Sequence, residues 1–278
     1  MKPSPMNGST LGFRRLGRTD AQVSGLAFGA FKLGRNEKIK YPNSYALPTE
    51  LEAEEILNGI LDLGINWIDT APAYGLSEER IGKALQARRK EFFLSSKVGE
   101  EFESGESRYL FHEKDPVPLF QKSLERSLRR LRTDSVDALL FHSDGRDLEI
   151  LSRPDFVEWI QETRRKGLAR WIGFSGKTPE GARMALSWSD LIMVEYHLLN
   201  RDHETVIAEA AQQGVGVLVK KGLGAGHLNA FESINFLLKN PGICSIVVGS
   251  LSLKHMKENW EHCQQFQQQD PRPNPGRS

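Results

Sequence analysis

Eight short apolar segments alternate with longer amphipathic segments along this chain, at residues 25–29, 66–69, 92–97, 136–142, 171–175, 191–196, 216–220 and 244–249. The short segments are almost continuously apolar, as parallel strands covered on both faces must be. The amphipathic segments are typical of helices and lie at about 50–63, 77–89, 116–131, 153–166, 178–187, 203–213, 230–239 and 252–266. Eight strand–helix units in succession predict an α/β fold, a (β/α)8 barrel of the TIM type.

The segment before the first predicted strand indicates a short β-hairpin. Residues 13–23 can turn at 18–20, and we expect this hairpin to cap the N-terminal end of the barrel. We expect one barrel domain over 11–263, with polar tails at 1–10 and 264–278. Three connections, at about 32–48, 98–114 and 143–152, are long and follow strand C-termini, so we expect them to shape substrate specificity.

The composition excludes several classes of function. The 278 residues include 37 Lys and Arg against 36 Asp and Glu, which gives no reason to expect nucleic acid or a membrane surface as a partner. No apolar run approaches the roughly 20 residues that span a bilayer, and the N-terminus has no signal-peptide core. Two cysteines, Cys244 and Cys263, make no disulfide framework. We expect a cytoplasmic protein, a monomer or weak oligomer.

Polar side chains stand at the C-terminal ends of three successive predicted strands. Asp69 ends the second strand, with Tyr74 five residues later in a Pro- and Gly-containing turn, Lys97 ends the third, and His142 ends the fourth. Neighbouring strands lie ~4.8 Å apart, so these groups fall within roughly 10 Å of one another. Each residue alone also has a structural explanation, but their combination at one barrel face favours a catalytic site.

This constellation suits proton transfer to a carbonyl oxygen. Asp69 supplies the partner that a buried Lys97 needs. We expect the ammonium of Lys97 to favour the phenolate of Tyr74, and thus to lower its pKa from the usual value of about 10. Tyr74 could then donate a proton to an oxygen whose carbon receives a hydride, while His142 hydrogen-bonds the same oxygen.

The motif Asp-Thr-Ala-x-x-Tyr-Gly at residues 69–75, with Lys97 and His142 on the next two strands, resembles the signature of the aldo-keto reductases. The resemblance runs from about residue 13 to 260. It implies NADPH- or NADH-dependent reduction of an aldehyde or ketone, or the reverse oxidation, with Asp69, Tyr74, Lys97 and His142 catalytic. The expected partner is a small carbonyl or alcohol, with Phe31 as one pocket wall. No His, Asp or Glu cluster has metal-ligand spacing, so no metal is expected.

The resemblance also implies a nicotinamide site, at which this chain departs from the family. Ser175 is kept, but Gly176 stands where an asparagine is usual, Met193 where a glutamine is usual, and Lys220 where an aromatic ring often stacks. The implied cofactor contacts are Gly29, Ser175, Gly176, Lys220, Gly222, Leu223, Gly224, Gly249, Ser250, Ser252, Lys254, His255, Glu258 and Asn259. Of these, the glycine-rich loop from Gly222 would bring its backbone close to a pyrophosphate.

The last strand and helix resemble the segment that holds adenosine in the family. Glu258 and Asn259 match residues that contact adenine, but His255 replaces an arginine seen in many members. Lys254 is the cation that could contact a 2′-phosphate, as a weaker point charge than an arginine. NADP(H) is therefore favoured, with NAD(H) an open option.

Two other functions stay open at the level of sequence. Lys97 could form a Schiff base in a barrel aldolase. The altered nicotinamide contacts also suit a weakly catalytic nucleotide-binding protein that acts as a sensor or partner.

Overall fold

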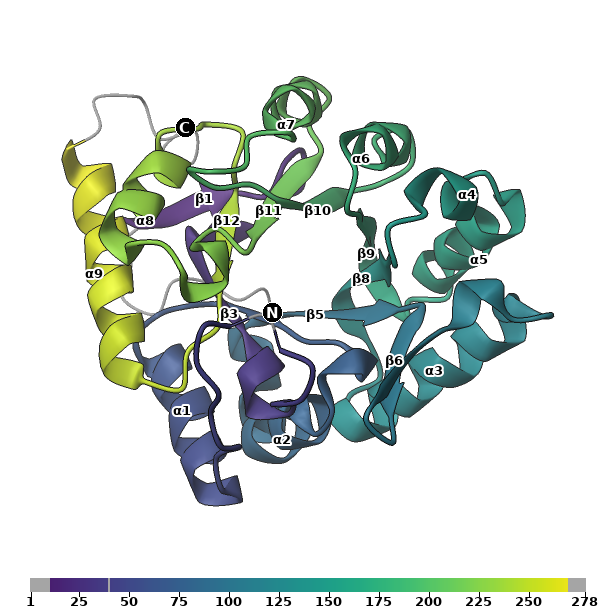
Figure 1. Cartoon of the computed structure of the whole chain (residues 1–278), viewed down its shortest axis with the longest axis horizontal. Helices are drawn as coiled ribbons and strands as arrows, with labels where there is room; N and C mark the ends of the chain where they lie inside the picture. The colour runs from purple at the N-terminus through teal and green to yellow at the C-terminus, as the bar shows by residue number, and fades with distance from the viewer. Residues whose placement is uncertain (1–10, 40, 270–278) are drawn as a thin grey trace.

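The computed structural model describes residues 11–39 and 41–269. Eight parallel strands close into a barrel in the order β10-β11-β12-β3-β4-β5-β8-β9, with the helices arranged around it (Figure 1). The barrel strands are β3 (Leu26–Gly29), β4 (Trp67–Asp69), β5 (Phe93–Val98), β8 (Val136–His142), β9 (Ala169–Ser175), β10 (Leu191–Glu195), β11 (Gly216–Lys220) and β12 (Ser245–Val248). The predicted (β/α)8 barrel is confirmed.

The helices lie close to the predicted positions. They are α1 (Glu50–Asp62), α2 (Ser77–Leu85), α3 (Pro116–Leu131), α4 (Asp147–Leu151), α5 (Pro154–Arg165), α6 (Pro179–Ala185), α7 (Glu204–Gln212), α8 (Ala230–Leu238) and α9 (Leu253–Gln269). Local chemistry sets their ends. The Thr49 side chain accepts a hydrogen bond from the Glu52 backbone N–H, and the Glu52 carboxylate accepts one from the Thr49 backbone N–H, which forms a capping box at the start of α1.

The predicted N-terminal hairpin is present. β1 (Phe13–Arg15) pairs with β2 (Gln22–Ser24) in antiparallel register. The Arg18 N–H donates to the Gly214 carbonyl over 2.7 Å, just before β11 begins. Leu16 is buried in the cluster that fills the barrel interior. The hairpin therefore covers the N-terminal end of the barrel and leaves the opposite end open.

Helix α9 extends beyond the expected boundary between barrel and tail. The expected tail begins at 264, but α9 continues to Gln269. The Gln267 side chain accepts a hydrogen bond from the Gly12 N–H over 2.7 Å, and the Trp260 ring packs edge-on against Phe13 at 5.7 Å between centroids. The last turns of α9 are thus attached to the N-terminal hairpin. The expected tails at 1–10 and 270–278 lie outside the described residues.

Two of the long connections contain structure that the sequence analysis did not predict. Residues 98–114 form an antiparallel hairpin, β6 (Glu100–Glu103) and β7 (Glu106–Tyr109). Its two turn residues, Ser104 and Gly105, both have positive φ, as a type I′ turn requires. The third connection, 143–152, contains α4. The β6–β7 hairpin stands over the open end of the barrel, beside β5 and β8 (Figure 1).

The barrel interior below this open end is tightly packed with aromatic rings. Trp67 of β4 stacks on Trp171 of β9, with 6.3 Å between centroids, and Phe93 of β5 packs against both. A rigid floor of this kind fixes the strand ends above it. No helix within 11–39 and 41–269 is long and apolar enough to cross a membrane.

Candidate active site

Lys97 and Asp69 form a buried ion pair at the ends of two adjacent strands. The Lys97 Nζ donates to both carboxylate oxygens of Asp69, over 2.8 and 2.7 Å, and to the Thr70 carbonyl over 2.9 Å. The two side chains are 0% and 3% exposed. Burial lowers the pKa of Lys97, and the charge of Asp69 opposes that shift. All three ammonium protons are therefore engaged.

A residue that the sequence analysis missed, Ser95, holds the carboxylate of this ion pair in place. The Ser95 hydroxyl donates to Asp69 Oδ1 over 2.7 Å and accepts from the Trp67 indole N–H over 3.0 Å. Strand alternation places Ser95 on the same face as Lys97, two residues before it. The alternation of inward and outward side chains along β5 could have revealed Ser95, because a serine among apolar residues on an inward face needs a polar partner.

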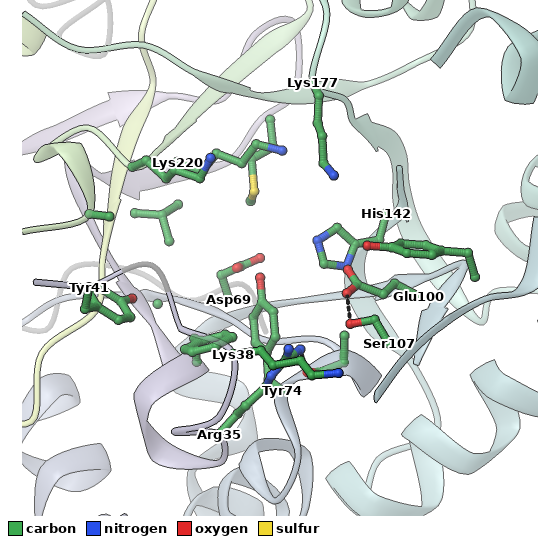
Figure 2. A pocket seen from close by; sticks show the side chains of 18 residues that line it. Arg35, Lys38, Tyr41, Asp69, Tyr74, Glu100, Ser107, His142, Lys177 and Lys220 are labelled. Atoms are coloured by element: carbon green, nitrogen blue, oxygen red, sulfur yellow. Dashed lines mark hydrogen bonds and ion pairs between the residues drawn. The ribbon is translucent and has the colours of Figure 1, made fainter. Parts of the chain in front are cut away.

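Tyr74 reaches the Lys97–Asp69 ion pair from the turn after β4. Its short 3-10 helix, η2 (Pro72–Tyr74), ends at Gly75, where φ is +57°. A Cβ on Gly75 would lie 2.2 Å from the Gly34 carbonyl oxygen, so only glycine fits this turn. The Tyr74 ring packs edge-on against Phe31 at 5.1 Å and against His142 at 6.0 Å between centroids. Its hydroxyl points into the space beside Asp69 (Figure 2).

The expected lowering of the Tyr74 pKa is wrong. Burial raises the pKa of Tyr74 well above its usual value, and the charges of Asp69 and Glu100 raise it further. Lys97 lies 4.8 Å from the centroid of the Tyr74 ring, but the charge of Asp69, to which it is bonded, opposes its effect on Tyr74, and burial is the largest contribution. Tyr74 therefore remains a protonated phenol at neutral pH, ready to donate.

His142 faces Tyr74 from the end of β8. Burial lowers the pKa of His142 well below its usual value, and the cations Lys97, Lys220, Lys177 and Arg35 lower it further. Its Nδ1 lies 3.1 Å from Oε2 of Glu100. The other oxygen of Glu100 accepts a hydrogen bond from the Ser107 hydroxyl over 2.9 Å. The β6–β7 hairpin thus brings a carboxylate to the histidine.

These groups line one cavity of about 410 Å³ at the open end of the barrel. Seven residues named from the sequence share it: Gly29, Phe31, Asp69, Tyr74, His142, Met193 and Lys220. Figure 2 shows the hydroxyl of Tyr74, the imidazole of His142 and the chain of Lys220 converging on its centre. Tyr109, on the connection 98–114 that we expected to shape specificity, also lines the cavity. Further lining residues were not predicted: Arg35, Lys38, Tyr41, Glu100, Ser107, Lys177, Lys221, Ala225 and others.

Lys220, Ser175 and Gly176 are brought together at the far wall of this cavity. The Lys220 Nζ donates to the Ser175 hydroxyl oxygen over 3.0 Å and to the Gly176 carbonyl over 2.7 Å. Burial and the charges of Lys221 and Lys97 lower the pKa of Lys220 to about 7. The ammonium form carries a third N–H, which suits the amide oxygen of a nicotinamide. The residues present therefore fit such a group.

The residues expected at the adenosine do not line the cavity. They lie in the first turns of α9 and the loop before it, where Lys254 is 82% exposed and 3.9 Å from the carboxylate of Glu258. The Ser252 hydroxyl accepts from the His255 N–H over 3.2 Å, as a helix cap. On the neighbouring loop, a Cβ on Gly222 would lie 2.6 Å from Leu237. Packing against α8 therefore explains that glycine without a ligand.

The described part of the chain holds no group of three His, Cys, Asp or Glu side chains that could bind a metal ion. Cys244 and Cys263 are both buried free thiols.

Comparison with known proteins agrees with this geometry. The model of the Aldo/keto reductase family matches residues 25–236. The chain therefore belongs to this family, whose members are NAD(P)H-dependent oxidoreductases.

Individual relatives cover most of the chain. A structure of a candidate aldo-keto reductase from Pseudomonas aeruginosa is 40% identical, with a TM-score of 0.83, covering 94% of this chain and 98% of that one. Aldo-keto reductase AKR11C1 from Bacillus halodurans, in its holo form, is 27% identical, with a TM-score of 0.75, covering 92% and 96%. L-galactose dehydrogenase from Arabidopsis thaliana is 33% identical, covering 88% of this chain and 86% of the relative.

Proposed function

We propose that this protein interconverts a small carbonyl compound and its alcohol by hydride transfer with NADP(H), or with NAD(H) as the less favoured cofactor. The observation that carries the proposal is the meeting of Tyr74, His142 and the Lys97–Asp69 ion pair at one cavity. A substrate oxygen beside the Tyr74 hydroxyl would lie next to both the proton donor and the imidazole.

The bound nicotinamide supplies or accepts the hydride, and the residues of this chain handle the proton. In reduction, Tyr74 donates its hydroxyl proton to the carbonyl oxygen as negative charge develops there. The raised pKa of Tyr74 keeps it protonated until that moment. Lys97, 4.8 Å from the ring centroid, then stabilises the phenolate. Lys220 and Ser175 would hold the nicotinamide amide.

The burial of Lys97 favours this function over an aldolase. A Schiff-base lysine must present a free amine to its substrate. The Lys97 side chain is fully buried, and its three N–H groups are bonded to Asp69 and Thr70. It does not have the access that covalent catalysis needs.

The test is carbonyl-dependent consumption of reduced cofactor. The protein is mixed with NADPH or NADH and a panel of aldehydes, ketones and sugars, and the nicotinamide absorbance is followed. Turnover with at least one carbonyl is expected. Tight NADPH binding without any turnover would instead indicate the nucleotide-binding sensor, and substrate trapped on Lys97 by borohydride would indicate the aldolase.

Cofactor choice gives a separate prediction. We expect NADPH to bind about tenfold more tightly than NADH, which corresponds to roughly 1.4 kcal/mol, because Lys254 is a point charge without the bidentate fork of arginine. Lys254→Ala should bring the two dissociation constants together in a fluorescence titration. Lys257→Ala, which removes another exposed lysine of α9, is the control. A preference above roughly a thousandfold that survives Lys254→Ala would place the phosphate elsewhere.

The remaining expectations stay proposals. They are a small-molecule partner with neither nucleic acid nor membrane, a monomer or weak oligomer, and a cytoplasmic setting.

A further inference from the structure

Lys220 is an amine of the cavity whose hydrogen-bond partners are both neutral. Its Nζ donates to the Ser175 hydroxyl oxygen over 3.0 Å and to the Gly176 carbonyl over 2.7 Å. The carboxylates whose charges reach it, those of Asp147 and Glu195, are bonded to other groups. Asp147 accepts backbone N–H groups of the loop after β9, and Glu195 is bonded to the next lysine in the chain. Because a lysine held away from water is ordinarily paired with an acid, these neutral partners are unusual.

The Lys220 nitrogen is held at one place on the cavity wall. Leu218, two residues earlier on β11, lies in the cluster that fills the barrel interior, so Lys220 also points inward. Its side chain crosses β10 to reach the end of β9. A Cβ on Gly176 would lie 2.7 Å from Oδ2 of Asp147, and the same oxygen accepts the Lys177 N–H over 2.7 Å. The loop that anchors Nζ is therefore itself fixed by packing and hydrogen bonds.

The surroundings of Lys220 favour a neutral amine with a lone pair directed into the cavity. Burial and the charges of Lys221 and Lys97 lower the pKa of Lys220 to about 7. At neutral pH roughly half of this amine is unprotonated, about 10³-fold more than for a lysine with the usual pKa of about 10.4. Its two N–H groups are taken by the two neutral acceptors, which leaves the lone pair. Figure 2 shows Lys220 on the wall opposite Arg35, with the open cavity between them.

We propose that Lys220 is a carbonyl-reactive amine, which condenses with a small aldehyde to form a Schiff base in the cofactor-free protein and is protected when nicotinamide is bound. The covalent site stands on the geometry of Lys220 alone. The protection rests on the proposed function, in which the same nitrogen holds the nicotinamide amide. The site differs from the aldolase considered above, because the three N–H groups of Lys97 are all bonded, whereas Lys220 lines the cavity.

The condensation is balanced without any further reactant. The Nζ lone pair attacks the carbonyl carbon, the π pair of the C=O bond moves to the oxygen, and a proton passes from nitrogen to that oxygen. The resulting carbinolamine loses its hydroxyl group and the second N–H proton as water, which leaves a C=N bond with no oxidation or reduction. A neutral imine also removes a cation from the neighbourhood of Lys97 and Lys221, so these charges favour it over the ammonium.

The consequence is competition between aldehyde and cofactor for one nitrogen. An aldehyde condensed with Lys220 occupies the position proposed for the nicotinamide amide, and hydrolysis of the imine releases it again. The site then favours reduction only when the cofactor binds before the aldehyde.

Reductive trapping tests the covalent site. The full-length protein, freed of nucleotide, is mixed at pH ~7 with propanal, quenched with borohydride, digested and mapped by mass spectrometry. We expect a propyl group on Lys220 at a propanal concentration at which Lys177 carries roughly tenfold less. Lys177 is the internal comparison, because it is an exposed lysine that lines the same cavity. Equal labelling of the two lysines, or none on Lys220, would overturn the proposal.

Two arginine variants and a second reagent make the assignment independent of the mapping. Lys220→Arg keeps a cation but removes the nucleophile, so the propyl group incorporated per chain should fall to the level of the exposed lysines. Lys177→Arg, the matched control, should keep full labelling of Lys220. Fluorodinitrobenzene reacts with unprotonated amines, and its rate at Lys220 should rise with pH and level off above pH ~8. A rate that keeps rising to pH ~10, or undiminished labelling of Lys220→Arg, would overturn the proposal.

Oxidised cofactor tests the part that rests on the proposed function. NADP⁺ cannot reduce the aldehyde, so the trapping can be repeated in its presence. At about ten times its Kd, NADP⁺ should lower the labelling of Lys220 roughly tenfold. Labelling that NADP⁺ leaves unchanged would overturn the protection and leave the covalent site standing. Failure of the proposed function is distinct, because then no carbonyl is reduced with either cofactor while the propyl group on Lys220 is still found.

Discussion

Tyr74→Phe will lower turnover by about 10²–10⁴-fold while cofactor binding stays within a few-fold. The hydroxyl is the proton donor, and phenylalanine keeps the ring that packs on Phe31 and His142. Because its raised pKa keeps Tyr74 protonated, the substitution removes the proton donor and leaves the packing of the ring unchanged. Steady-state rates with the best carbonyl substrate give the first quantity, and fluorescence titration with NADPH gives the second.

Tyr41→Phe is the matched control for this result. Tyr41 lines the same cavity and packs against Phe31 at 6.1 Å between centroids. The substitution removes a phenol hydroxyl that does not lie beside His142. We expect less than a tenfold change, well below the range for a general acid. Wild-type turnover in Tyr74→Phe would mean that another group supplies the proton.

The strand ends explain why much of the catalytic set could be read from the sequence. Asp69 and His142 end β4 and β8, and Lys97 lies one residue before the end of β5, between them in the barrel. The pairing of Asp69 with Ser95 puts Lys97 within reach. A parallel barrel offers one face at which strand C-termini meet. Once the strands were identified, the proximity of these side chains followed.

The β6–β7 hairpin shows where that reasoning stops. Glu100, Ser107 and Tyr109 lie in a connection that looked irregular, because each of its strands has only four residues. Ser104 and Gly105 between alternating residues were a turn signal. That signal identifies a hairpin, but it does not say that the hairpin folds inward and brings a carboxylate to His142.

The directions of the pKa shifts were harder to predict than the positions of the side chains. The sequence places Lys97 near Tyr74, and a free ammonium there would lower the phenol pKa. The outcome depends on burial and on how fully Asp69 neutralises the ammonium. With both carboxylate oxygens bonded to Nζ, the pair acts as a dipole, and burial raises the pKa of Tyr74 instead. Likewise, Lys220 was recognised as a departure, but its bonds to Ser175 and Gly176 required the structure.

Lys97→Met is expected to lose both activity and stability. Methionine removes the charge that stabilises the Tyr74 phenolate and leaves the 3%-exposed Asp69 carboxylate without its cation. Breaking a buried pair in this way costs about 3–5 kcal/mol. Asp69→Asn should lose less, because Lys97 keeps the Thr70 carbonyl and gains an amide oxygen. Denaturant unfolding and melting curves measure the stability, and steady-state rates measure the activity.

The pH dependence of that loss identifies its cause. Without Lys97, the buried Asp69 should take up a proton, so its folded-state pKa rises above the unfolded value of about 3.9. The folded state then binds more protons than the unfolded state between those two values, and stability falls as pH rises through that window. The loss of stability in Lys97→Met should therefore be larger at pH ~8 than at pH ~5.

A double variant, Lys97→Met with Asp69→Leu, removes both charges and should regain much of the stability without the activity. An unchanged melting temperature in Lys97→Met at both pH values would mean that the lysine does not hold this carboxylate.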